Sequence, residues 1–154
     1  MKYLVLYLKP CSKMPRDAYA YLGFQINNGN VKHLVATSRG LETVTSRCEE
    51  CIFYKLASSS YVYGQPAIVG GKLKVIVSDN RAVRRLISQH LPQVVKVVEM
   101  RHTGLIITDR QREVLLSLAN GHNLTTVARQ NNVSKVAVYK MFKTALRKLS
   151  LILA

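Results

Sequence analysis

The spacing of apolar positions changes along the chain, which divides it into a β-rich first part and a helical last part. Alternating or continuous apolar runs predict strands at Leu4–Leu8, Val31–Thr37, Tyr61–Val69, Lys72–Ser78 and Val94–Glu99. Gly70-Gly71 is expected to close a hairpin between two of these strands, because glycine tolerates the tight turn.

Helical spacing occurs twice within the first hundred residues. Apolar residues recur every three or four positions from Leu41 to Leu56 and predict an amphipathic helix over 41–57. A second helix is expected to begin after Asn80 and to end at Pro92. The sequence therefore predicts an α/β domain over residues 1–104, large enough for its own core, with a short linker at Met100–Gly104.

Residues 107–151 predict three short helices with their own start and stop signals. Thr108 and Gln111 have the spacing of a capping box, and Asn120-Gly121 is a typical helix end. Asn123 is placed to cap the second helix, and Ser134 to cap the third. The chain should therefore end in a small all-α domain over residues 105–154.

The third predicted helix, about 135–149, has two distinct faces. Five apolar residues cluster on one side: Val138, Met141, Phe142, Ala145 and Leu149. The opposite side carries Val136, Lys140, Lys143 and Arg147, flanked by Tyr139 and Thr144. Three helices with a basic third one are the layout of a helix-turn-helix domain, whose third helix enters the major groove of DNA.

Composition also favours a polyanionic partner. The chain holds 23 Lys and Arg against eight Asp and Glu, a formal net charge of +15. Within residues 106–154, eight basic residues stand against two acidic ones. No segment approaches the roughly 18 apolar residues of a membrane-spanning helix, and none pairs a basic face with a strongly apolar one.

The last third resembles the LuxR/FixJ-type helix-turn-helix of bacterial transcription regulators. The matching residues are Ile107-Thr108, Arg110, Glu113-Val114-Leu115, Ala119, Gly121, Val127-Ala128, Val133-Ser134, Val138 and Arg147-Lys148-Leu149. Their spacing agrees without insertion or deletion. The chain departs from the family at Ala137 and Met141. The family's fourth helix, which often supports dimer contacts, is not expected, because only Ser150–Ala154 follow Leu149 in this sequence.

The resemblance implies double-stranded DNA as the partner and assigns roles on the third helix. Lys140 and Lys143 are expected to contact bases or phosphates, with Val136 and Tyr139 on the base-facing side. Phosphate contacts are expected from Thr125, Arg129, Thr144 and Arg147, and Lys135 belongs to the same DNA-binding set. The protein would then act as a transcription regulator, more often an activator in this family. It would work as a homodimer or with another regulator, and RNA polymerase would be a further partner.

The first domain contains residue types that metals and catalysis use. Cys48, Cys51, Cys11 and His33 are of the kinds that bind zinc, but Cys48 falls on the apolar side of the predicted helix 41–57. Asp79 follows a strand as in response-regulator receivers, yet it stands alone. No paired carboxylates or Ser-His-Asp set stands out, so we expect no enzyme, no metal and no cofactor.

Two other readings stay open. A region-four-like module of a sigma factor uses a similar helix-turn-helix, and a sensor or partner-binding module could act through the first domain. The apolar run after Met1-Lys2 ends at Lys9-Pro10, too short for a signal peptide, so a cytoplasmic location is expected. The three cysteines are then expected to be reduced.

Overall fold

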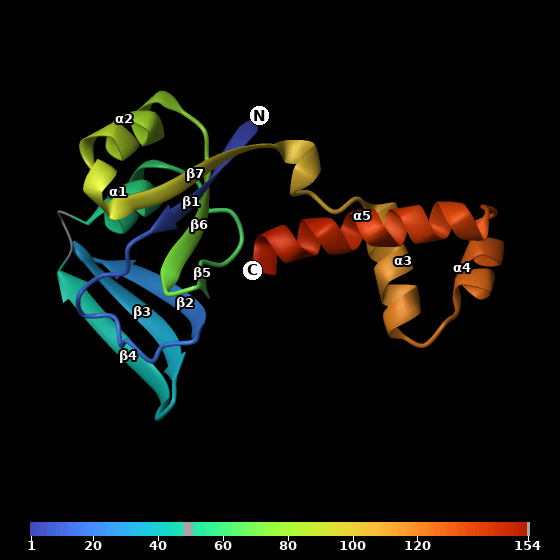
Figure 1. Cartoon of the computed structure of the whole chain (residues 1–154), viewed down its shortest axis with the longest axis horizontal. Helices are drawn as coiled ribbons and strands as arrows, with labels where there is room; N and C mark the ends of the chain where they lie inside the picture. The colour runs from blue at the N-terminus through green and yellow to red at the C-terminus, as the bar shows by residue number, and fades with distance from the viewer. Residues whose placement is uncertain (48–50, 154) are drawn as a thin grey trace. The chain divides into compact units, whose positions relative to one another are not determined.

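The computed structural model describes residues 1–47 and 51–153, which form two compact units (Figure 1). The first unit covers Met1–Arg101 and the second covers His102–Leu153. The first contains both β-sheets and two α-helices, and the second is helical. The expected mixture of an α/β part and a helical C-terminal part is confirmed.

The first unit is built around a four-stranded antiparallel sheet. Its strands are β1 (Lys2–Leu8), β5 (Ala67–Val69), β6 (Lys72–Ser78) and β7 (Val94–Arg101). They lie in the order β5-β6-β1-β7, so the apolar strand β1 is central. The Gly70-Gly71 hairpin is confirmed, since both residues have positive φ, 54° and 71°, between Val69 and its partner Lys72.

A second sheet is a three-stranded meander of β2 (Ala20–Asn27), β3 (Asn30–Thr37) and β4 (Gly40–Arg47). Asn28 and Gly29 join the first two strands, with φ of 46° and 76°. Asn-Gly is the preferred pair for such a two-residue hairpin. Strand β2 was not among the strands expected from the sequence.

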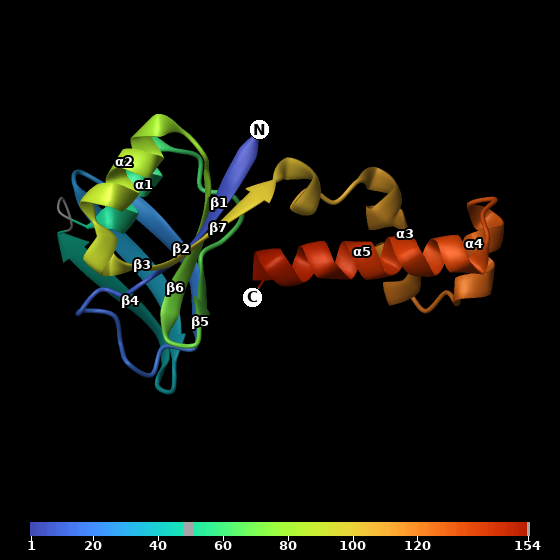
Figure 2. The same ribbon diagram turned by 45° about the horizontal axis from the view of Figure 1, so that its top comes forward.

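Helices α1 (Ile52–Ser59) and α2 (Arg81–Gln89) lie next to each other in both views (Figures 1 and 2), and a short 3₁₀ helix, Leu91–Gln93, precedes β7. The expected cap of α2 is confirmed, because Asn80 Oδ1 accepts from the Val83 amide at 2.9 Å. One core joins the two sheets and both helices: Leu4, Leu6, Leu8, Met14, Tyr21, Val31, Val35, Ile52, Phe53, Leu56, Leu73, Val75, Val77 and Val83.

The predicted helix over 41–57 is wrong in its first part. Residues 40–47 form β4, and the helix begins only at Ile52. Thr43, Val44 and Thr45 lie in the middle of the segment, and β-branched residues fit a strand better than a helix. Cys48 lies outside the described residues, so the argument that placed it on an apolar helix face is not tested.

Two other boundaries also differ from expectation. Of the predicted strand Tyr61–Val69, only Ala67–Val69 is a strand, while Val62 forms a single bridge to Val77. Gly64 has a φ of 68°, which interrupts the extended backbone. The predicted linker Met100–Gly104 is partly structured, since β7 continues to Arg101 and a 3₁₀ turn, His102–Gly104, follows.

The second unit consists of α3 (Asp109–Ala119), α4 (Leu124–Gln130) and α5 (Lys135–Leu153). Its core is small, with Val114, Val127, Ala128 and Val138 buried. Leu118, Leu124, Val133, Met141 and Phe142 pack around these four. Each of the three helices therefore contributes side chains to one core.

Helices α3 and α4 both end in the same hydrogen-bonded turn. After α3, the Gly121 and His122 amides donate to the carbonyls of Leu118 and Ser117, both at 3.1 Å. After α4, the Asn132 and Val133 amides donate to the carbonyls of Arg129 and Ala128 in the same pattern. This Schellman arrangement requires a left-handed residue, here Gly121 (φ 90°) and Asn132 (φ 51°).

Substitutions at Gly121 and Asn132 should affect the stability of the second unit differently. Gly121→Ala should lower the free energy of local unfolding by about 1 kcal/mol, because an L side chain is strained at positive φ. Asn132→Gly should not destabilise, since glycine adopts this conformation without strain. Hydrogen–deuterium exchange of peptides from residues 105–153 measures both. An Asn132→Gly variant less stable than Gly121→Ala would contradict this account.

Candidate nucleic-acid interface

Helix α5 contains most of the residues that the sequence assigns to DNA. Ser134 caps it as expected, with its Oγ accepting from the Ala137 amide at 3.1 Å. The helix was expected to end near Leu149, but it continues to Leu153. The residues after 149 therefore extend α5 and do not form a separate element.

The solvent-facing side of α5 carries seven of the nine predicted residues. Six are exposed, namely Lys135, Val136, Tyr139, Lys140, Lys143 and Arg147, and Thr144 is half-buried. Four of them recur at positions 136, 140, 143 and 147, which places them on one helical stripe about 16 Å long. A stripe of this length can follow the edges of several base pairs in a major groove about 12 Å wide. We call the seven residues the basic face.

The basic face is positive and lacks compensating charge. Helix α5 contains no Asp or Glu at any position. Among the described residues, no carboxylate forms an ion pair with Lys140, Lys143 or Arg147. Lys143 Nζ lies 5.4 Å from the centre of the Tyr139 ring, a cation–π contact within the face. These cations remain available for an anionic partner.

The other two predicted residues, Thr125 and Arg129, lie on α4. Both are exposed and four positions apart, so they share one side of that short helix. Between them in sequence, Val127 and Ala128 are buried in the core with Val138 of α5. The same apolar contact thus fixes α4 against α5 while its polar residues face solvent.

Lys148 belongs to the interior of the second unit, although its sequence neighbour Arg147 is exposed. Its side chain is buried, and its Nζ donates to the Ile106 carbonyl at 2.7 Å and to Gln111 Oε1 at 3.0 Å. Gln111 Oε1 also accepts from the Thr108 amide, which completes the capping box of α3. Lys148 therefore ties α5 to the beginning of α3. On a helical wheel Lys148 lies beside the apolar residue Met141, and this position could have indicated from the sequence that its side chain faces the interior.

The metal-ligand and phosphoacceptor candidates of the first unit can be placed in part, since Cys48 lies outside the described residues. Within the described ranges, no three His, Cys, Asp or Glu side chains come together as metal ligands. Asp79 accepts two hydrogen bonds of 2.7 Å from Arg84, which lowers the pKa of the carboxyl below its usual value. Arg84 also bonds Glu99. Asp79 is therefore a member of a surface ion-pair group.

Comparison with other proteins gives no assignment. The chain matches no protein-family model, no curated protein and no solved structure. Across residues 1–47 and 51–153, no helix combines the length and the apolar character needed to cross a membrane. The geometry of the basic face is therefore the main evidence on function.

Substitution by methionine should affect the stability of the second unit differently at two lysines of α5. Lys148→Met should destabilise the second unit by about 2 kcal/mol, because two part-buried acceptors lose a charged donor. Lys135→Met, at an exposed position of the same helix, should change stability by less than about 0.5 kcal/mol. Hydrogen–deuterium exchange of peptides from 105–153 compares the two variants. Equal stability of both would show that the interior contacts of Lys148 contribute nothing.

Proposed function

We propose that residues 102–153 form a helix-turn-helix domain that binds double-stranded DNA, and that the protein is a sequence-specific transcription regulator. The observation that carries this proposal is the basic face of α5, which is exposed, positively charged and free of acidic residues. Lys and Arg on one helical stripe are the electrostatic footprint expected of a groove-binding helix.

The packing of the three helices supports the same function. Recognition by a helix requires that it be held rigidly while one side stays free. Val138 and Ala145 are fully buried on one side of α5, while Val136 and Tyr139 are 62% and 48% exposed on the other. An exposed valine and tyrosine among lysines are costly in water but suit contacts with bases, such as the thymine methyl group.

The roles divide by position in the domain. Lys140, Lys143, Val136 and Tyr139 face the bases in this proposal. The phosphate contacts come from Thr125, Arg129, Lys135, Thr144 and Arg147, which lie around the stripe and on α4. Phosphate contacts position the domain, and base contacts select the sequence.

The first unit is the proposed source of pairing and regulation. One small domain offers little contact surface, and such domains gain specificity by binding two half-sites as a dimer. We therefore infer a homodimer, or a heterodimer with another regulator, joined through residues 1–101. The β-sheets of this unit favour a regulator over a sigma-factor module, which needs a polymerase-binding segment upstream. Activation through RNA polymerase is the favoured mode.

Binding should depend steeply on salt. If the basic face and α4 make about five to eight phosphate contacts per bound unit, log K should fall with log salt concentration by about 0.9 per contact. Fluorescence anisotropy with labelled duplex DNA between low and moderate salt measures the slope. An affinity that does not change with salt would exclude this mode of binding.

Mutation should distinguish the residues that contact bases from those that contact only phosphates. Lys140→Ala and Tyr139→Ala should weaken binding to the preferred site by about 1–3 kcal/mol more than binding to random DNA. Arg129→Ala should weaken both by similar amounts, because it contacts only phosphate in the proposal. The preferred site comes from selection among genomic fragments.

A matched control is Arg85→Ala, on the exposed side of α2 in the first unit. This variant removes one positive charge from outside the proposed interface and should leave site preference unchanged. If Lys140→Ala and Tyr139→Ala also leave site preference unchanged, α5 is not the helix that reads the sequence.

A further inference from the structure

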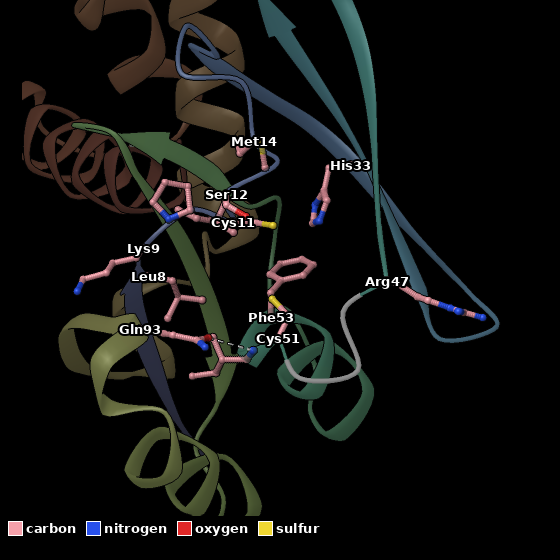
Figure 3. Close-up of a pocket in the computed structure, with 13 residues that line it drawn as sticks. Leu8, Lys9, Cys11, Ser12, Met14, His33, Arg47, Cys51, Phe53 and Gln93 are labelled. Atoms are coloured by element: carbon pink, nitrogen blue, oxygen red, sulfur yellow. Dashed lines mark hydrogen bonds between the residues drawn. The ribbon is translucent and has the colours of Figure 1, made fainter.

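The first unit contains a cavity of about 360 Å³ that the DNA-binding proposal does not use (Figure 3). Its apolar wall is made of side chains that are nearly or fully buried: Leu8, Met14, Ile52, Phe53 and Leu73. These residues come from β1, the loop before β2, α1 and β6. A volume of this size lies within the range of small-molecule sites.

A few polar groups also line this cavity. Figure 3 shows the thiols of Cys11 and Cys51 and the ring of His33 pointing toward its interior. Ser12 and Gln93 complete the polar part of the lining, and Gln93 Oε1 accepts from the Ile52 amide at 3.4 Å. The amide nitrogen of Gln93 and the hydroxyl of Ser12 are further hydrogen-bond donors.

His33 is held so that it offers a donor to the cavity. Its Nδ1 lies 2.6 Å from the Tyr21 hydroxyl, which has no other partner among the described residues. Burial raises the pKa of Tyr21, so the phenol keeps its proton, and burial lowers the pKa of His33, so the ring is neutral. When the phenol O–H donates its hydrogen bond to Nδ1, the neutral ring carries its own proton on Nε2, which is then a donor.

The charged side chains of the described cavity lining are positive. Lys9 and Arg47 are the charged residues of its described lining, and no Asp or Glu is among them. Both side chains extend away from the interior in Figure 3, so they raise the potential at the rim without filling the space. A second cavity of about 360 Å³ shares Pro10, Cys11, Ser12, Met14 and Leu73 with the first and adds Arg16 and Lys72.

We propose that the cavity lined by Cys11, His33 and Cys51 binds a small carboxylate with an apolar body. The apolar wall takes the hydrocarbon part, the neutral donors of His33, Ser12 and Gln93 face the carboxylate oxygens, and the positive rim favours an anion over a cation. This site would make the first unit a ligand-binding domain. The proposal does not depend on DNA binding, and its test is made without DNA.

The test uses octanoate as the probe and octylammonium, of equal chain length, as the opposite-charge control. Calorimetric titration of the full-length protein should show one octanoate per chain, bound at least about tenfold more tightly than octylammonium. Octanoate should also slow the reaction of Cys11 and Cys51 with N-ethylmaleimide by about fivefold or more, because both thiols face the ligand. Peptide mass spectrometry reads the two cysteines separately.

A steric variant locates the site. Ser12→Trp places a large ring in the cavity wall and should weaken octanoate binding at least about tenfold. Lys13→Trp is the matched control, since Lys13 is the next residue, is exposed and lines neither cavity. It should bind octanoate as the unchanged protein does.

Three results would overturn the proposal. They are no octanoate binding, equal binding of octanoate and octylammonium, and full binding by Ser12→Trp with no protection of the two thiols. Circular dichroism of Ser12→Trp checks that the variant is folded. If that variant is unfolded, the thiol protection and the charge preference measured on the unchanged protein decide the outcome.

Discussion

The burial of one side of α5 is the constraint on which the second unit depends. Val138 packs in one core with residues of α3 and α4, and Ala145 on the same side of α5 is also fully buried. This burial fixes which side of the helix faces solvent. The rotation of the helix about its axis is therefore set by apolar packing, and the basic face follows from it. A substitution in this small core should affect DNA binding without touching a DNA-facing residue, because the core holds few large side chains and tolerates little loss.

Buried hydrogen bonds select among the arrangements that apolar packing permits. Lys148 binds two acceptors from the segment that begins α3, so it connects the two ends of the helical unit. In the first unit, Tyr21 and His33 satisfy each other inside the core, where an unpaired hydroxyl or imidazole would be costly. A polar contact inside an apolar core has few alternative partners, so it selects one arrangement among several that apolar packing alone would permit.

The helical unit could be predicted from the sequence in detail because its signals are local. Caps such as Thr108 and Ser134 act within three residues, and helical periodicity needs no knowledge of distant partners. The first unit was predicted less well, since strand pairing depends on residues far apart in sequence. The segment 40–47 has apolar spacing compatible with a helix, and only its pairing with β3 makes it a strand. The sequence analysis gave Lys148 no structural role, because its two hydrogen-bond partners precede it by 42 and 37 positions.

The two units have cores of different size, which suits the different roles proposed for them. The second unit has a small core, centred on the buried cluster Val114, Val127, Ala128 and Val138. The first unit has two sheets that enclose a larger core, and irregular loops such as 10–16 leave cavities at its edge. In the proposed function, a small-molecule signal acts on residues 1–101, where the cavities of this core lie. If the first unit binds a small carboxylate as proposed, its effect on the proposed DNA binding would act through a change in the pairing of the first unit or in the orientation of the second.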